Sequence, residues 1–169
     1  SILDNPPDLS GLPEVFTKSL TAWDNMFPLG DPIDYEPARD QSVLHQAERK
    51  GCSPAELAYD TMLERNGKGI IYMPLLGYSN GNVEALREMM QHPHAVFGLS
   101  DGGAHCGLIC DASMPSYLLT HWARDRSRGE RLPIEELVHK QTRRTATFYG
   151  LDDRGLIAVG MKADINVID

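Results

Sequence analysis

The stretch that decides the fold reads VFGLSDGGAH over residues 96–105. A short apolar run ends on Asp101, Gly102 and Gly103 follow, and His105 lies four positions beyond the acid. In a parallel α/β sheet, a carboxylate at the carboxyl end of a strand stands where ligands and metals bind. The glycines let a substrate approach the backbone closely, because they have no Cβ. The stretch therefore indicates a catalytic carboxylate, with a plain helix cap at Asp101 as the alternative.

The runs around this stretch follow the strand and helix order of a βα repeat. We expect strands over Ile70–Leu75 and Ala95–Ser100, adjacent and parallel. Gly51 is suited to end one helix, and Ser53 with Glu56 forms the capping box of the next. The expected helices cover residues 41–50, 54–65, 82–91, 117–126 and 134–148. This order predicts an α/β fold with a right-handed βαβ crossover.

The end of the chain carries a second motif, which reads RGLIAVGMKADINV over residues 154–167. It resembles the tail of the amidohydrolase superfamily, where a helix ends at Gly-Leu and a turn of the type R-G-x-I-x-x-G-x-x-A-D-I-x-V follows. The stretches Cys110–Tyr117 and Thr120–Arg126 resemble the N-acyl-D-amino-acid deacylase (D-aminoacylase-like) branch. The resemblance covers residues 68–169 and extends more loosely to the earlier part.

The resemblance implies the C-terminal part of a (β/α)8 TIM-like metal-dependent hydrolase barrel, comprising about strands seven and eight. A complete barrel needs about 250 residues, and the chain has 169, so a fragment is expected. In this interpretation, residues 1–40 form a loop-rich, lid-like segment and residues 41–150 the C-terminal βα units of the barrel. Residues 151–169 form the exit strand toward the small β domain.

The resemblance also implies roles for the residues after the expected eighth strand. Asp101 matches the aspartate that binds the catalytic divalent metal and moves a proton from water to the leaving amine. His105, with Gly102 and Gly103, is expected to contact the substrate, while a structural hydrogen bond is the alternative for His105. Zinc is the expected metal of the full-length enzyme. One carboxylate is a poor site for a divalent cation, so we expect the fragment to bind none tightly and to be inactive alone.

The function implied is hydrolysis of the amide C–N bond of an N-acyl amino acid or of a related compound. Membership of the N-acyl-D-amino-acid deacylase branch would imply a D-configured amino acid. The loop after Asp101 reads CGLIC over residues 106–110, and lacks the arginine that many deacylases place there for the substrate carboxylate. One alternative is a non-catalytic fragment or assembly module. Another is a barrel glycosidase that uses Asp101, which needs a second carboxylate and leaves the tail unexplained.

The composition is that of a soluble globular protein, with 41% hydrophobic residues, 24% charged residues and a net charge of −8. This balance argues against a nucleic-acid partner, and no run approaches the ~18 apolar residues of a membrane span.

The chain has three cysteines. This odd number favours a reducing compartment, so a cytoplasmic location is expected. A small-molecule amide is the expected partner. Open sheet edges predict self-association or pairing with the missing part of the same chain.

Several other polar side chains allow a functional and a structural interpretation. Tyr78 follows the first expected strand, where pocket residues are found, and His121 shares a helix face with Tyr117, which favours packing. Three acids near prolines are explained by turn chemistry rather than by a metal cluster: Asp24, Asp31 and Asp34. Four arginines are interpreted as a solvated helix end rather than a basic pocket: Arg124, Arg126, Arg128 and Arg131.

Overall fold

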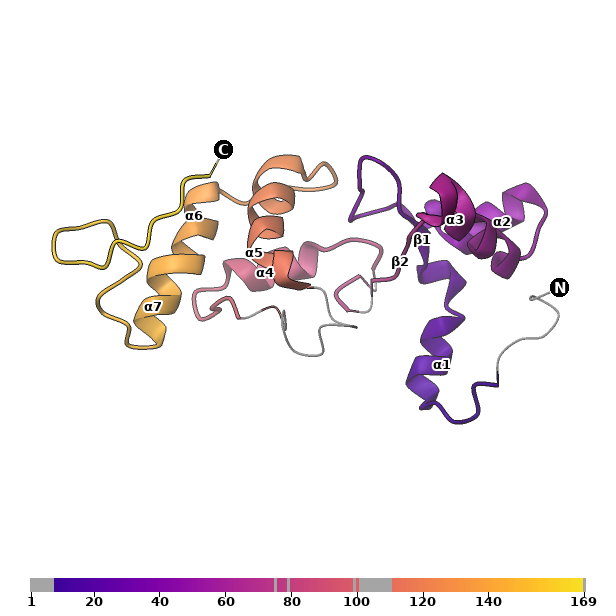
Figure 1. Ribbon diagram of the computed structural model, residues 1–169, viewed down its shortest axis with the longest axis horizontal. Coiled ribbons are helices and arrows are strands. Elements are labelled where there is room, and N and C mark those ends of the chain that lie inside the picture. The colour runs from indigo at the N-terminus through magenta and orange to yellow at the C-terminus, as the bar shows by residue number, and fades with distance from the viewer. Residues whose placement is uncertain (1–7, 75, 79, 99, 101–110, 169) are drawn as a thin grey trace. The chain divides into compact units, whose positions relative to one another are not determined.

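The computed structural model describes residues 8–74, 76–78, 80–98, 100 and 111–168. The chain divides into two compact units, residues 1–83 and residues 84–169, and each has buried apolar residues of its own. Helices dominate the described part of both units (Figure 1). No helix in that part is long and apolar enough to cross a membrane.

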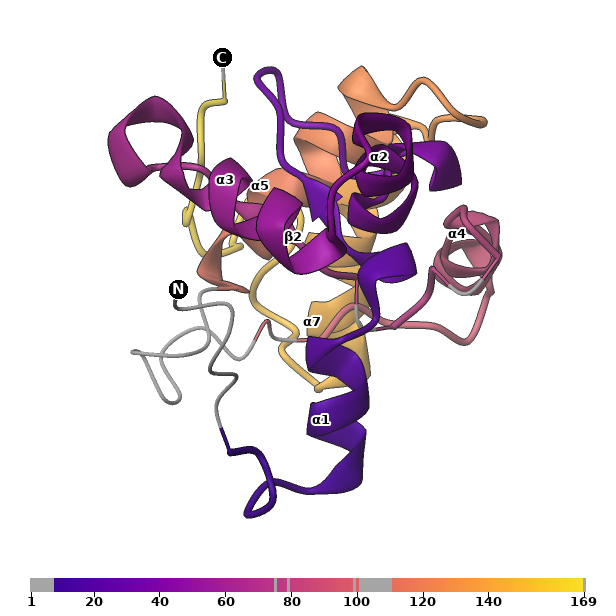
Figure 2. The same ribbon diagram turned by 90° about the vertical axis from the view of Figure 1, so that its right-hand side faces the viewer.

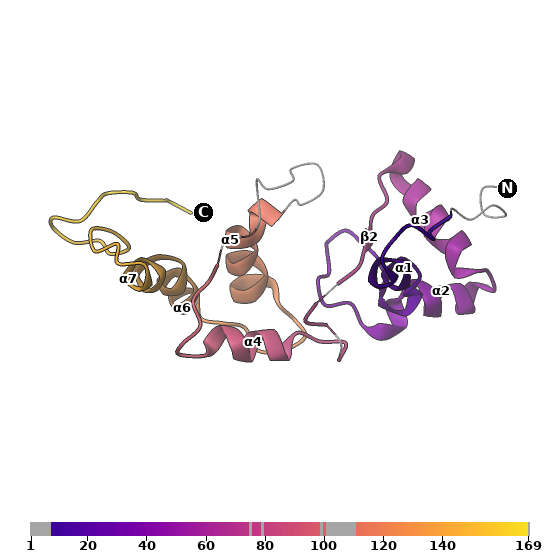
Figure 3. The ribbon, with the colours of Figure 1, turned by 90° about the horizontal axis from the view of Figure 1, so that it is seen from below.

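The first unit is built on a pair of helices that enclose a small core. Helices α2 and α3 lie side by side (Figures 1 and 2), and Figure 3 shows α1 nearly end-on beside them. The core consists of Met26, Val43, Ala47, Leu57 and Ala58. The elements are α1 Glu14–Leu20, η2 Trp23–Asn25, β1 Phe27–Pro28, η3 Arg39–Gln41, α2 Val43–Lys50, α3 Pro54–Gly67 and β2 Ile71–Tyr72.

Local capping chemistry sets the ends of these helices, as the sequence predicts. Gly51 ends α2 with φ 70°, and the Ser53 hydroxyl accepts the backbone N–H three residues later at 3.2 Å. Ser42 caps α2 in the same way at 3.3 Å, and this cap was not predicted from the sequence. Helix α3 loses helical geometry near its end, because Arg65 and Asn66 have φ of 53° and 60°.

The expected pair of adjacent parallel strands is not found in the described part of the chain. Of the first run only β2 is a strand, and it pairs antiparallel with β1. Residues 95–98 form no strand, and the barrel strands are therefore unconfirmed. A strand exists only through its pairing partner, and the carbonyl of Ala95 is instead hydrogen-bonded to a helix side chain, Arg144 Nε, at 3.1 Å.

The second unit contains the helices expected after residue 82. Helices α6, η6 and α7 follow one another without interruption and confirm the expected helix over 134–148 (Figure 1). Its buried apolar residues are Leu118, Trp122, Leu132, Leu137 and Ala146. The elements are α4 Glu84–Gln91, η4 Asp111–Ser113, α5 Met114–Tyr117, π-helical η5 Leu118–Asp125, α6 Ile134–His139, π-helical η6 Lys140–Arg144 and α7 Thr145–Phe148.

A fully buried arginine ties this unit together. The side chain of Arg126 is 0% exposed and pairs with Glu84 Oε1 at 2.6 Å. Its other terminal nitrogen donates to the carbonyl of Glu130 at 2.7 Å, and its Cζ lies 4.7 Å from the ring centroid of Trp122. The interpretation of the arginine run as a solvated helix end is therefore wrong for Arg126, because this guanidinium bridges segments far apart in sequence.

The expected exit strand is likewise absent from residues 151–168, which form turns and irregular backbone. Ile165, Val167 and Ile168 in this segment are exposed. The alternation of apolar and polar residues predicts a strand only when a partner is available to accept its hydrogen bonds.

Candidate functional site

The residues predicted to carry catalysis fall in a part of the chain that the structure does not describe. Asp101, Gly102, Gly103 and His105 all lie outside the described residues. Their assignment as catalytic, substrate-binding and metal-binding residues stays a prediction. Residues 95–98 and 100 before this stretch and residues 111–168 after it are described.

On the downstream side, the aromatic residues of α5 and η5 form a compact stack. The imidazole of His121 lies parallel to the Tyr117 ring with centroids 5.0 Å apart, and meets Trp122 edge-on at 5.5 Å. His121 is buried. This arrangement agrees with the packing interpretation of His121, since the ring faces aromatic neighbours.

A pocket of about 400 Å³ opens beyond the end of β2, in the first unit. Its volume is within the range of small-ligand sites, which are mostly apolar with a few polar groups. Buried Tyr78, predicted from its place after the strand, forms part of the wall, and its hydroxyl donates to the carbonyl of Pro37 at 2.5 Å. The lining residues are Asp24, Asn25, Phe27, Arg39, Pro74, Leu76, Gly77, Tyr78 and Gly81.

Two polar side chains of this pocket are fixed by contacts with the wall. Asn25 Nδ2 donates to the carbonyl of Pro74 at 2.8 Å. Arg39 lies against Gly81, whose φ is +68° and where an added Cβ would come within 2.9 Å of Arg39 Nε. A glycine is therefore needed for the arginine to lie here. Arg39 was not predicted from the sequence, because its neighbours along the chain are turn residues and the glycine beside it, Gly81, is distant in sequence.

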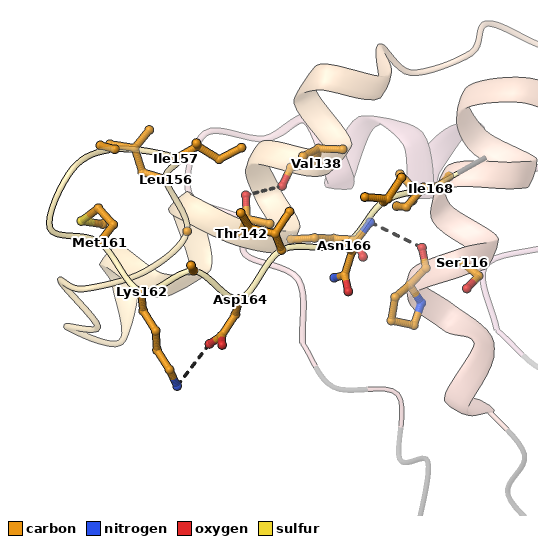
Figure 4. Close-up of a pocket in the computed structure, with 18 residues that line it drawn as sticks. Ser116, Val138, Thr142, Leu156, Ile157, Met161, Lys162, Asp164, Asn166 and Ile168 are labelled. Carbon is orange, nitrogen blue, oxygen red and sulfur yellow. Dashed lines mark hydrogen bonds and ion pairs between the residues drawn. The ribbon is translucent and has the colours of Figure 1, made fainter.

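The tail motif packs against η6 through its glycine. Gly155 has φ +80°, and an added Cβ would lie 2.8 Å from Arg143 Cα. The following segment borders a groove of about 900 Å³, and Lys162 Nζ pairs with Asp164 Oδ2 at 3.2 Å. Figure 4 shows these side chains. The Arg-Gly element of the motif thus has a packing role in this chain.

Replacing Gly155 with alanine should destabilise the second unit by about 1–3 kcal/mol, because the new Cβ strains the left-handed backbone and collides with η6. Urea unfolding measures this loss. Gly160→Ala is the matched control, since Gly160 has φ +86° and nothing within 4 Å of an added Cβ. Equal losses in the two variants would contradict the packing role.

The described residues hold no group of three or more His, Cys, Asp or Glu side chains that could bind a metal ion. The Asp34 carboxylate accepts the backbone N–H of Glu36 at 2.8 Å, which supports the turn interpretation of this acid. The set of described donors does not fit a catalytic zinc, which takes about three protein ligands.

Comparison with known proteins identifies the family. A profile of the Amidohydrolase family matches residues 21–169. The chain belongs to the amidohydrolase family. The match supports hydrolase function, and the family is generally metal-dependent. No curated protein and no solved structure matches this amidohydrolase chain significantly.

Proposed function

We propose that this chain is the C-terminal part of a barrel hydrolase that cleaves the amide C–N bond of an N-acyl amino acid. The carrying observation is Asp101, which ends an apolar run inside the region matched to the amidohydrolase family. The resemblance of Cys110–Tyr117 and Thr120–Arg126 to the N-acyl-D-amino-acid deacylase branch supports D-configured substrates.

Asp101 is proposed to move the proton of the reaction. Water attacks the amide carbon and forms a C–O bond, while its proton passes to a carboxylate oxygen of Asp101. The same proton then passes to the amide nitrogen, so that the C–N bond breaks and the carboxylic acid and the amine leave. Proton transfer by a positioned carboxylate typically contributes 10²–10⁴-fold.

Metal dependence, with zinc as the metal, is part of the proposal and rests on the family alone. Asp101 is the one residue of this chain proposed as a ligand. The described residues supply no group of three or more side chains that could complete the ligand set. Metal analysis of the complete protein tests this part.

The proposed function is tested by a panel of N-acetyl-D-amino and N-acetyl-L-amino acids with the complete protein. Release of the free amine, dependence on added zinc and preference for one configuration are measured together. Amine release from the D-series supports the branch, and release from the L-series alone refutes it. A protein that self-associates but releases no amine from any substrate of the panel would favour the alternative interpretation, a non-catalytic fragment or assembly module.

A further inference from the structure

Helix α3 ends in a short left-handed turn. Arg65, Asn66 and Gly67 have φ of 53°, 60° and 77°, and the departure from helical geometry begins at Glu64. A residue with a Cβ is strained in this conformation, and asparagine is among the few that adopt it readily. The pair Asn66-Gly67 is therefore suited to the tip of a left-handed turn.

The tip of this turn is open to solvent. Residues 62–68 are all exposed, and an added Cβ at Gly67 would have nothing within 4 Å. The turn is closed at its ends, where the N–H groups of Lys68 and Gly69 donate to the Glu64 carbonyl at 3.0 and 3.1 Å. Segments with few buried contacts open locally at low cost, so the tip can change conformation without disturbing the core of the unit.

An asparagine followed by glycine gives this freedom a chemical consequence. The backbone nitrogen of the glycine attacks the side-chain Cγ of the asparagine, and glycine hinders the attack least because it has no Cβ. A new C–N bond forms, the bond between Cγ and the amide nitrogen breaks, and ammonia leaves with the proton of the backbone N–H. Water then opens the five-membered succinimide ring at either carbonyl, which gives aspartate or isoaspartate.

The same unit contains a second pair of this kind, Asn80-Gly81, which provides an internal comparison. Gly81 is buried, and its N–H, the group that would attack, donates to the carbonyl of Tyr78 at 2.9 Å. An added Cβ at Gly81 would lie 2.9 Å from Arg39 Nε, so this glycine is closely packed. Two pairs that are alike in sequence therefore differ in burial and in the hydrogen bonding of the attacking nitrogen.

We propose that Asn66 is a site of spontaneous deamidation in the folded protein and that Asn80 is protected. The modification places a carboxylate at the tip of the turn, and isoaspartate also lengthens the backbone by one carbon atom. Next to the site, Arg65 Nη2 donates to the carbonyl of Leu29 at 3.1 Å, and the Leu29 N–H donates to the carbonyl of Ile70 at 2.8 Å. The modified residue therefore adjoins the contacts that join the turn to the ends of β1 and β2.

The test incubates the complete protein at mildly alkaline pH, both folded and in concentrated guanidinium chloride. Cleavage after glutamate releases residues 65–84 as one peptide that carries both pairs, and mass-spectrometric fragmentation assigns the mass gain to one asparagine or the other. In the folded protein, Asn66 is expected to deamidate about tenfold or more faster than Asn80, because Gly81 must first lose its hydrogen bond and its packing. In guanidinium chloride the two rates should become similar, since both pairs are then exposed.

Two matched variants assign the isoaspartate that forms, measured by methyl transfer from an isoaspartate-specific methyltransferase. Asn66→Gln should remove most of the signal of the folded protein, because the longer side chain closes the ring far more slowly, whereas Asn80→Gln should leave the signal unchanged. Circular dichroism verifies that each sample is folded. Equal rates at the two asparagines in the folded protein, or a faster rate at Asn80, would overturn the inference, as would an Asn66 that reacts only in guanidinium chloride.

Discussion

Asp101→Asn is expected to lower kcat of the complete protein on N-acyl amino acids by about 10²–10⁴-fold. The amide keeps the size of the side chain but removes the oxygen charge that accepts the proton of the attacking water. KM and the unfolding midpoint should change little, because a proton-transfer group acts chiefly in the transition state. Steady-state amine release and urea unfolding measure the two effects.

Asp60→Asn provides the control for this experiment. Asp60 is exposed on α3, so its loss tests the effect of removing one negative charge from a chain with net charge −8. Equal activity of Asp101→Asn and wild type would end the claim that this carboxylate carries the proton. An active wild type that contains no metal and needs none would end the metal-dependent part.

Arg126→Met should reduce the unfolding free energy of the second unit by about 1.5–3 kcal/mol. The substitution removes a 0% exposed guanidinium from its pair with Glu84, and it removes the hydrogen bond to the Glu130 carbonyl. The Glu130 carbonyl loses a charged donor, which accounts for the size of the effect, whereas the Glu84 side chain is 47% exposed and is solvated by water after the substitution. For a domain of ordinary stability this is a large part of the total, so a lower unfolding midpoint in urea should be plain.

The neighbouring Arg124 offers a matched control for that measurement. Arg124 pairs with Asp125 at 2.7 Å, but both side chains are more than half exposed. Exposed ion pairs contribute little because water and salt screen them, and Arg124→Met should leave the unfolding midpoint unchanged. If the two arginine variants lose the same stability, the buried network around Arg126 does not have the role assigned to it.

These two arginines show why charge alone is a poor guide to structure. In sequence they are one basic run, and a solvated helix end is the natural interpretation. Whether a guanidinium is buried depends on partners such as Glu84, which comes from another segment of the unit. Arg39 was missed for the same reason, because the glycine that receives it lies about forty positions away.

The sequence by itself determined the features that depend on neighbouring residues and on motifs. Gly51 ends α2 and Ser53 caps the start of α3, as predicted, because a cap involves only a few adjacent backbone groups. The tail motif and the glycine-rich stretch were sufficient to indicate the amidohydrolase family, which the match over residues 21–169 bears out. Asp101 is likewise a prediction of sequence alone.

Only the tertiary structure decided which segments meet. It paired β2 with β1 instead of with the run at 95–98, it buried Arg126 and Lys140, and it brought Arg39 to the pocket beyond β2. Each outcome depends on long-range partners. The free energy of a strand or a buried charge lies in the hydrogen bonds and contacts that another segment supplies, and local sequence does not specify that segment.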